Sequence, residues 1–243
     1  MTLKRSAVFG GISAIFVVAQ FAWPAAAQTE QQLTTWCDNE DGNVTPDNRI
    51  TGCTGLIRLN AKDKVAFFNR GIAYYDKKDF DRAIADYTRA IQLDAKVADY
   101  FKERASAYDA KKDYARAIAD YLQASTIDPE NADALNSRCW DEAIIGQLQP
   151  ALADCNRALK LQSADADFFD TRGFTYLKLG QFDNAIADYN GALKLNPKLA
   201  SSLYGRGFAK LKKGDSTGGN ADIAAAKGIK ADIADELAGF GVK

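Results

Sequence analysis

The chain has 243 residues, of which 47% are hydrophobic, so it is long enough to bury the core of one domain or two. Its 31 Lys and Arg residues are nearly balanced by 32 Asp and Glu, a balance that disfavours nucleic acid or an anionic membrane surface as partner. The chain contains no His, which excludes the usual catalytic triads and most zinc hydrolase sites.

Residues 1–27 have the pattern of a secretory signal peptide. Two basic residues at 4–5 precede an apolar run over 7–23, and small residues follow at 25–27. We expect cleavage after Ala27, a mature chain that starts at Gln28, and export, in the style of a Gram-negative bacterium to the periplasm. The alternative is an uncleaved anchor, for which the run is short and abruptly ended.

The segment 28–63 is related to the residues that follow it. Its stretch "RITGCTGLIRLNAK" matches "RAIADYTRAIQLDAK" further along the chain and aligns Cys53 with Tyr87. The preceding stretch 38–46 is polar and contains Gly42 and Pro46. We therefore expect a partial capping repeat in which a loop replaces much of the first helix.

From Lys64 onward the chain repeats with a period of 34 residues. Five rows align without insertion or deletion, and we number the 34 columns from the first residue of each row. The rows are 64–97, 98–131, 132–165, 166–199 and 200–231. Small residues recur where two helices would touch, and column 20 reads Ala83, Ala117, Ala151, Ala185 and Gly219.

Each row predicts a pair of helices. Both halves keep helical spacing of apolar residues, and pairs such as Lys78-Asp79 and Gly180-Gln181 mark a short turn between them. Beyond the fifth row, the spacing of Ile233, Leu237 and Phe240 predicts a short helix within 232–243 that caps the stack.

The small, aromatic and proline columns resemble the tetratricopeptide repeat (TPR), as in "YFKERASAYDAKKDYARAIADYLQASTIDP". Five copies in register carry this resemblance. It implies an all-α fold, a right-handed superhelix (α-solenoid) of helix hairpins in which the first helix of each pair lines a concave surface.

The four cysteines form two equivalent pairs in this frame. Cys37 and Cys53, like Cys139 and Cys155, occupy columns 8 and 24, which lie on the facing helices of one hairpin. Of the three possible connectivities, we predict Cys37 with Cys53 and Cys139 with Cys155. The alternative is a redox-active thiol pair, although active dithiols are usually closer in sequence.

Arginine and aspartate recur together in every full row and are both missing from the capping segment. Column 7 reads Arg70, Arg104, Arg138, Arg172 and Arg206, and column 23 reads Asp86, Asp120, Asp154, Asp188 and Asp222. We predict that each pair forms within its own hairpin and holds the register of its two helices. The alternative is that the arginines form a binding stripe for an acidic ligand.

The resemblance places columns 2, 5, 9 and 12 of each first helix on the concave surface. The candidate groove residues are Phe68, Ile72, Tyr75, Lys102, Ser106, Asp109, Asn136, Trp140, Asp170, Phe174, Leu177, Tyr204, Phe208 and Leu211. Phe68 and Ile72 stand where the TPR branch that binds acidic chaperone tails needs Lys and Asn, so an apolar polypeptide fits better. The alternative, left open, is that several of these side chains pack between helices or beneath the C-terminal cap.

We therefore expect a scaffold or adaptor that binds a polypeptide, with no enzymatic activity, cofactor or metal. No Gly-rich phosphate loop or catalytic motif is present in the sequence. The other function considered is a carrier of a small ligand or cell-wall fragment in the aromatic groove. Fold alone does not decide between them.

Overall fold

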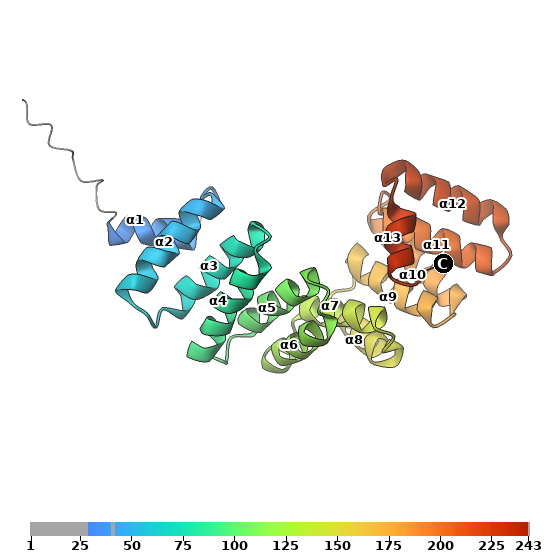
Figure 1. The fold of residues 1–243 in the computed structure, drawn as a ribbon. Helices are drawn as coiled ribbons and strands as arrows, with labels where there is room; N and C mark the ends of the chain where they lie inside the picture. Colours follow the sequence, from blue (N-terminus) through green and yellow to red (C-terminus); the bar gives the residue numbers. More distant parts are fainter. Residues whose placement is uncertain (1–28, 40–41, 243) are drawn as a thin grey trace, which may run out of the picture.

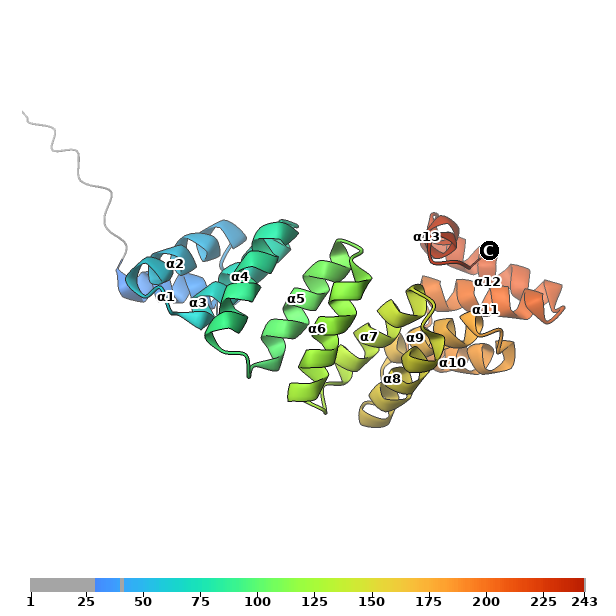
Figure 2. The same ribbon diagram turned by 60° about the horizontal axis from the view of Figure 1, so that its bottom comes forward.

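The computed structural model describes residues 29–39 and 42–242, and the predicted signal peptide lies outside this part of the chain. Within it the chain forms thirteen α-helices and no strand. Successive helices pack as hairpins that follow one another along an elongated, curved stack (Figures 1 and 2). The prediction of an all-α superhelix of hairpins is confirmed.

Each of the five rows contains two helices. The pairs are α3 (Lys64–Asp76) and α4 (Phe80–Leu93), α5 (Ala98–Ala110) and α6 (Tyr114–Ile127), α7 (Ala132–Ile144) and α8 (Leu148–Leu161), α9 (Ala166–Lys178) and α10 (Phe182–Leu195), and α11 (Ala200–Lys212) and α12 (Ser216–Ile229).

The turn inside each of the five hairpins contains one residue with left-handed backbone, and in three of them an aspartate side chain caps the second helix. Column 15 has positive φ in every row, at Lys78 (60°), Lys112 (60°), Gly146 (86°), Gly180 (71°) and Gly214 (89°). After it, the side chain of Asp79 or Asp113 accepts a hydrogen bond from the backbone of the second helix. A short polar turn therefore reverses the chain at the same place in each row.

The small columns allow the two helices of a hairpin to approach closely. Ala83 and Ala90 on α4 are fully buried. A Cβ atom at Gly71 would stand 2.6 Å from Cε1 of Tyr87, so glycine there makes room for a fully buried aromatic ring. Packing of large residues against small ones thus builds the core of each repeat.

The first hairpin is more complete than the sequence predicted. Helix α1 (Glu30–Asp38) has 9 residues against 13 in the other first helices, and α2 (Pro46–Leu59) is full length. The loop therefore replaces only the last turn of the first helix, and the expectation that it replaces much of the helix is wrong. Thr29 caps α1, and Pro46 occupies the first turn of α2, where proline needs no backbone donor.

The chain ends in the predicted short helix, α13 (Ile233–Gly239). It packs against α11 and α12, and the residues after it reach back to α9, where Lys178 Nζ donates to the carbonyl of Phe240 at 3.2 Å. Figure 1 shows α13 lying across the C-terminal hairpins rather than continuing the stack. The cap therefore covers part of the surface that the sequence assigned to a ligand.

Candidate functional site

The groove residues of α3 are aromatic and partly exposed. Phe68 packs between two tyrosine rings, with ring centroids 5.7 Å from Tyr87 and 4.8 Å from Tyr100 of the next first helix. Tyr75 packs edge-on against Phe80 at 5.4 Å. These side chains, with Ile72, are half-buried, so they contribute both to packing between repeats and to the surface. On α3, therefore, these side chains both pack between helices and line the groove, so both alternatives that the sequence left open apply.

Polar side chains continue this surface on α5 and the start of α7. Lys102, Ser106, Asp109 and Asn136 are all half-buried. The hydroxyl groups of Ser106 and Tyr121 lie 3.1 Å apart, and Lys102 Nζ lies 3.5 Å from Asp99 and 3.4 Å from Glu103. We name the surface formed by the candidate residues of α3, α5 and the start of α7 the open half of the groove, from Phe68 to Asn136.

The remaining candidates from Trp140 to Leu177 lie under the C-terminal segment, and we name this part the covered half. Trp140 packs between Phe174 at 4.7 Å and Phe240 at 5.3 Å. Phe174 and Leu177 are 3% and 6% exposed. The prediction that these two residues line an open surface is corrected, because the tail of the chain fills it. The residual cavity has a volume of about 10 Å³, which leaves no room for a small ligand.

Asp170 also belongs to the covered half, and it accepts a hydrogen bond from Ser202 of α11. Burial raises the pKa of the Asp170 carboxyl to about 6. Tyr204, Phe208 and Leu211, the candidates on α11, are half-buried, and the first two pack against the core of the C-terminal hairpins. Of the fourteen candidates, seven therefore belong to the open half, four to the covered half, and the three on α11 lie half-buried on the C-terminal hairpins.

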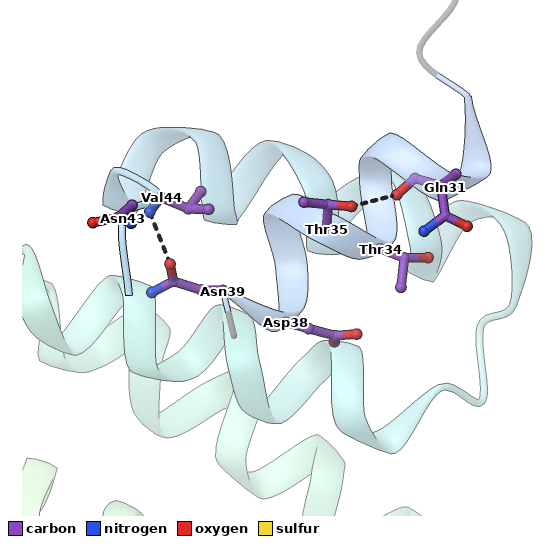
Figure 3. A pocket seen from close by; sticks show the side chains of 7 residues that line it. All are labelled: Gln31, Thr34, Thr35, Asp38, Asn39, Asn43 and Val44. Atoms are coloured by element: carbon purple, nitrogen blue, oxygen red, sulfur yellow. Dashed lines mark hydrogen bonds between the residues drawn. The ribbon is translucent and has the colours of Figure 1, made fainter. Parts of the chain in front are cut away.

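The first hairpin has a polar pocket formed by α1 and the turn that follows it (Figure 3). Its lining residues are Gln31, Thr34, Thr35, Asp38, Asn39, Asn43 and Val44. Gln31, Thr34 and Asp38 stand in groove columns 2, 5 and 9 of the common frame. The sequence pattern did not single them out, because a loop was expected in place of much of the first helix. The threonine cap and the helical spacing of Leu33 and Cys37 were the available signals.

The predicted arginine and aspartate pairs are confirmed in all five hairpins. In the second repeat, for example, Arg104 donates from Nε and Nη2 to the two carboxylate oxygens of Asp120 at 2.7 and 2.8 Å. Its third nitrogen, Nη1, donates to Thr88 of the preceding repeat at 3.0 Å. Arg172 makes the same third bond to Asn156 at 2.9 Å. Each arginine therefore joins two repeats as well as two helices, a link that the sequence analysis did not foresee.

This arrangement argues against the arginines as a ligand stripe. Their charge is matched by a buried carboxylate, and the side chain of Arg104 is only 17% exposed. Bidentate bonds fix the guanidinium plane, so little of its hydrogen-bonding capacity remains for an external ligand.

The predicted disulfide pairing is also confirmed. The Sγ atoms of Cys37 and Cys53 are 2.11 Å apart, and those of Cys139 and Cys155 are 1.99 Å apart. All four cysteines are fully buried. Each bridge ties the first helix of a hairpin to its second, so both act as staples within a repeat.

Three carboxyl groups meet at the junction between the second and third repeats. Burial, together with the nearby carboxyl of Asp109, raises the pKa of Asp141 to about 9, and these two groups share a hydrogen bond. Burial and the charge of Asp154 raise the pKa of Glu142 to about 7. One oxygen each of Asp141 and Glu142 is buried without a hydrogen-bond partner. Arg138 is the cation at this junction, 4.0 Å from Glu142.

These raised pKa values predict that the protein loses stability as the pH rises. The folded state holds protons that the unfolded state releases near pH 4, so the stabilisation present below that pH is lost as pH rises through about 7 and then about 9. Asp141→Asn should therefore raise the free energy of unfolding at pH 8 by about 1–3 kcal/mol and flatten its pH dependence. Urea unfolding at several pH values measures both effects.

The matched control for this prediction is Asp133→Asn, an exposed aspartate on the same helix. Its pH profile should follow the wild type. If the free energy of unfolding had the same slope against pH in Asp141→Asn as in the wild type, the buried carboxyl group of Asp141 would not be the source of the pH dependence.

The described residues contain neither a candidate metal site nor a candidate membrane-spanning helix. No group of three or more His, Cys, Asp or Glu side chains within residues 29–39 and 42–242 is arranged to hold a metal ion. No helix in the described part of the chain combines the length and apolar character needed to cross a bilayer.

Comparison with known proteins supports the repeat assignment. Models of the TPR repeat match residues 173–214, and models of the tetratricopeptide repeat match residues 65–96 and 103–131. No protein of curated function matches the chain in sequence.

Several solved structures share the fold. YrrB, described as a TPR protein with an unusual peptide-binding site, aligns with a TM-score of 0.62 and 22% identity over 76% of this chain and 97% of its own. A TPR protein from Parabacteroides merdae has a TM-score of 0.70 and 17% identity, over 86% and 87%. MamA has a TM-score of 0.61 and 22% identity, over 71% and 94%. With its repeat matches, its stacked hairpins and its recurring small columns, the chain belongs to the tetratricopeptide-repeat proteins.

Proposed function

We propose that the protein is a non-enzymatic scaffold that binds a segment of another polypeptide along the open half of the groove. The observation that carries this proposal is a set of half-buried side chains in the groove columns of successive first helices, aromatic on α3 and polar on α5 and α7. Aromatic side chains held in place by packing serve as anchors for a peptide, because little rotamer freedom is lost when the partner binds. The peptide-binding site of the structurally similar YrrB supports the same reading.

The charges around this surface favour a partner that carries basic as well as apolar residues. Lys102 is already engaged by Asp99 and Glu103. Burial and the nearby carboxyl groups of Asp109 and Glu103 raise the pKa of Tyr75, so acidic groups lie close to the aromatic anchor. A segment with Lys or Arg next to an aliphatic or aromatic residue complements this arrangement. The same acidic surroundings disfavour nucleic acid as partner.

The site of action that we propose is outside the cytoplasm, in the cell envelope. The signal peptide pattern and the two disulfides support it, because such bridges persist in oxidising compartments. We propose no catalytic step, because the sequence has no His and the carboxyl groups of Asp141 and Glu142 are buried.

Affinity capture from the exported fraction tests the binding proposal. The Ile72→Ala, Tyr75→Ala double variant should lose at least tenfold in affinity for a partner that the wild type captures, because two of the three apolar side chains of the open half are truncated. Binding is then measured by calorimetry with a synthetic segment of that partner. The same sample tests the predicted signal peptide. The intact mass of the exported chain should be that of a protein that starts at Gln28.

The matched control is Tyr74→Ala on the neighbouring position of α3, where the ring stacks under Arg82 at 4.6 Å rather than in the groove. Melting temperatures of both variants are compared with the wild type. Equal affinity of the double variant and the wild type for every captured segment would overturn the proposal. Substitutions at Trp140 and Phe174 are unsuitable for this test, because the tail covers both residues.

A further inference from the structure

The C-terminal segment ends in a turn that brings two aliphatic side chains together. Gly241 has φ of 93°, and the amide of Val242 donates to the carbonyl of Leu237 at 3.0 Å. This is the hydrogen-bond pattern of a Schellman motif, in which the residues at its two ends are in apolar contact. Leu237 and Val242 are accordingly both buried, at 5% and 4% exposure.

The two side chains fill the covered half of the groove. They complete a pocket whose walls include Trp140 of α7, Phe174 and Leu177 of α9 and Tyr189 of α10. Gly205 of α11 leaves the space for the tyrosine ring, because a Cβ atom there would stand 2.4 Å from its Cζ. Phe240 closes the rim with its ring edge-on to Trp140. The tail thus presents an aliphatic residue, an aromatic residue three positions on, and a second aliphatic residue two positions further.

The segment is built to fold only where it docks. Helix α13 has 7 residues and no side-chain cap at its start, and a helix this short is unstable alone in water. A three-residue connection, 230–232, joins it to α12. Its order therefore depends on the apolar contacts in the pocket.

The ammonium group of Lys178 contacts the tail through an uncharged backbone carbonyl rather than through a carboxylate. Lys178 Nζ donates to two backbone carbonyls, that of Ile144 at 3.1 Å and that of Phe240 at 3.2 Å. Within the described residues no carboxylate forms an ion pair with it. Burial lowers the pKa of the Lys178 ammonium, so docking removes water from a cation whose partners among the described residues are two carbonyl oxygens and the ring of Phe174, with its centroid 5.4 Å from Nζ. Release of the tail would expose the Lys178 ammonium to water again.

We propose that the pocket of Trp140, Phe174, Leu177 and Tyr189 is a second polypeptide-binding site, which the chain's own segment 233–242 occupies in cis. A partner segment with the same order of aliphatic, aromatic and aliphatic side chains as Leu237, Phe240 and Val242 binds there by displacing it. This inference rests on the proposed scaffold function and adds to it a site whose access the tail controls. The tether gives the tail an effective concentration of about 1 mM, so a competitor must bind the pocket better than the tail does or be held nearby by the open half.

A labelled peptide of residues 230–243 tests the inference in trans on the full-length protein. The Leu237→Ser, Val242→Ser variant should release its own tail and bind the peptide one to one. The wild type, whose pocket is filled, should bind it at least tenfold more weakly. Adding Trp140→Ala to the released variant should abolish binding. Tryptophan emission should shift to the red on release and return with peptide, and this change should be missing when Trp140 is replaced by Phe.

The same peptide-binding assay provides a control variant and the results that would overturn the inference. Glu236→Gln, an exposed change in the tail, should behave as the wild type. Equal binding of the peptide to the wild type and the released variant, or no binding by a released variant that keeps its helical circular dichroism at about 1 mM peptide, would overturn the inference. Because the peptide is the chain's own, this result is independent of whether the open half captures an external partner.

Discussion

Arg104→Ala should lower the free energy of unfolding by about 3–5 kcal/mol, because breaking a buried ion pair leaves one charge uncompensated. The change removes both bonds to Asp120 and leaves that carboxylate, 9% exposed, without its counter-ion. It also removes the bond to Thr88, so both the hairpin and its contact with the preceding repeat are weakened. Equilibrium unfolding in urea measures the change.

Two further variants isolate the cause. Arg116→Ala removes an exposed arginine of the same hairpin, 60% accessible, that pairs with Asp113, and it should leave the urea midpoint close to that of the wild type. Arg104→Met with Asp120→Leu replaces the whole pair by apolar groups and should recover most of the loss. An unchanged melting temperature for Arg104→Ala, together with loss of ligand binding, would instead favour the arginines as a binding stripe.

Removing the bridge between Cys37 and Cys53 should destabilise the first hairpin by about 3 kcal/mol, the loop-closure value for a ring of this size. The hairpin is terminal, and α1 is a turn shorter than its counterparts, so it has fewer contacts with which to compensate. In the Cys37→Ala, Cys53→Ala variant, hydrogen exchange should accelerate in residues 30–59. Residues 98–131 should keep their protection.

The second bridge provides the comparison. Cys139→Ala with Cys155→Ala lies in the middle of the stack, so its loss should lower the melting temperature of the whole protein rather than of one end. Uniform acceleration of exchange in the Cys37→Ala, Cys53→Ala variant would contradict a local role for the first bridge. Unchanged exchange in residues 30–59 would contradict any stabilising role.

The sequence by itself determined the repeat, the disulfide pairing and the ion-pair ladder. These features depend on residues within one hairpin, and a period of 34 places every such residue in the same surroundings five times. The occurrence of Arg in column 7 together with Asp in column 23 therefore indicates a contact that lies within one hairpin and recurs in every row. For the same reason the two cysteine pairs could be assigned from their columns, and the structure confirmed both.

Only the tertiary structure decided which part of the groove is accessible. Leu237 and Val242 reach Trp140 and Phe174 from far along the chain, and no periodicity encodes where a short terminal helix will dock. Both halves have aromatic residues among the groove columns, Phe68 and Tyr75 in one and Trp140 and Phe174 in the other, so the sequence pattern could not show which half is covered. The extent of α1 was likewise settled by contact, since burial of Leu33 and Cys37 against α2 stabilises a helix that its polar composition did not predict.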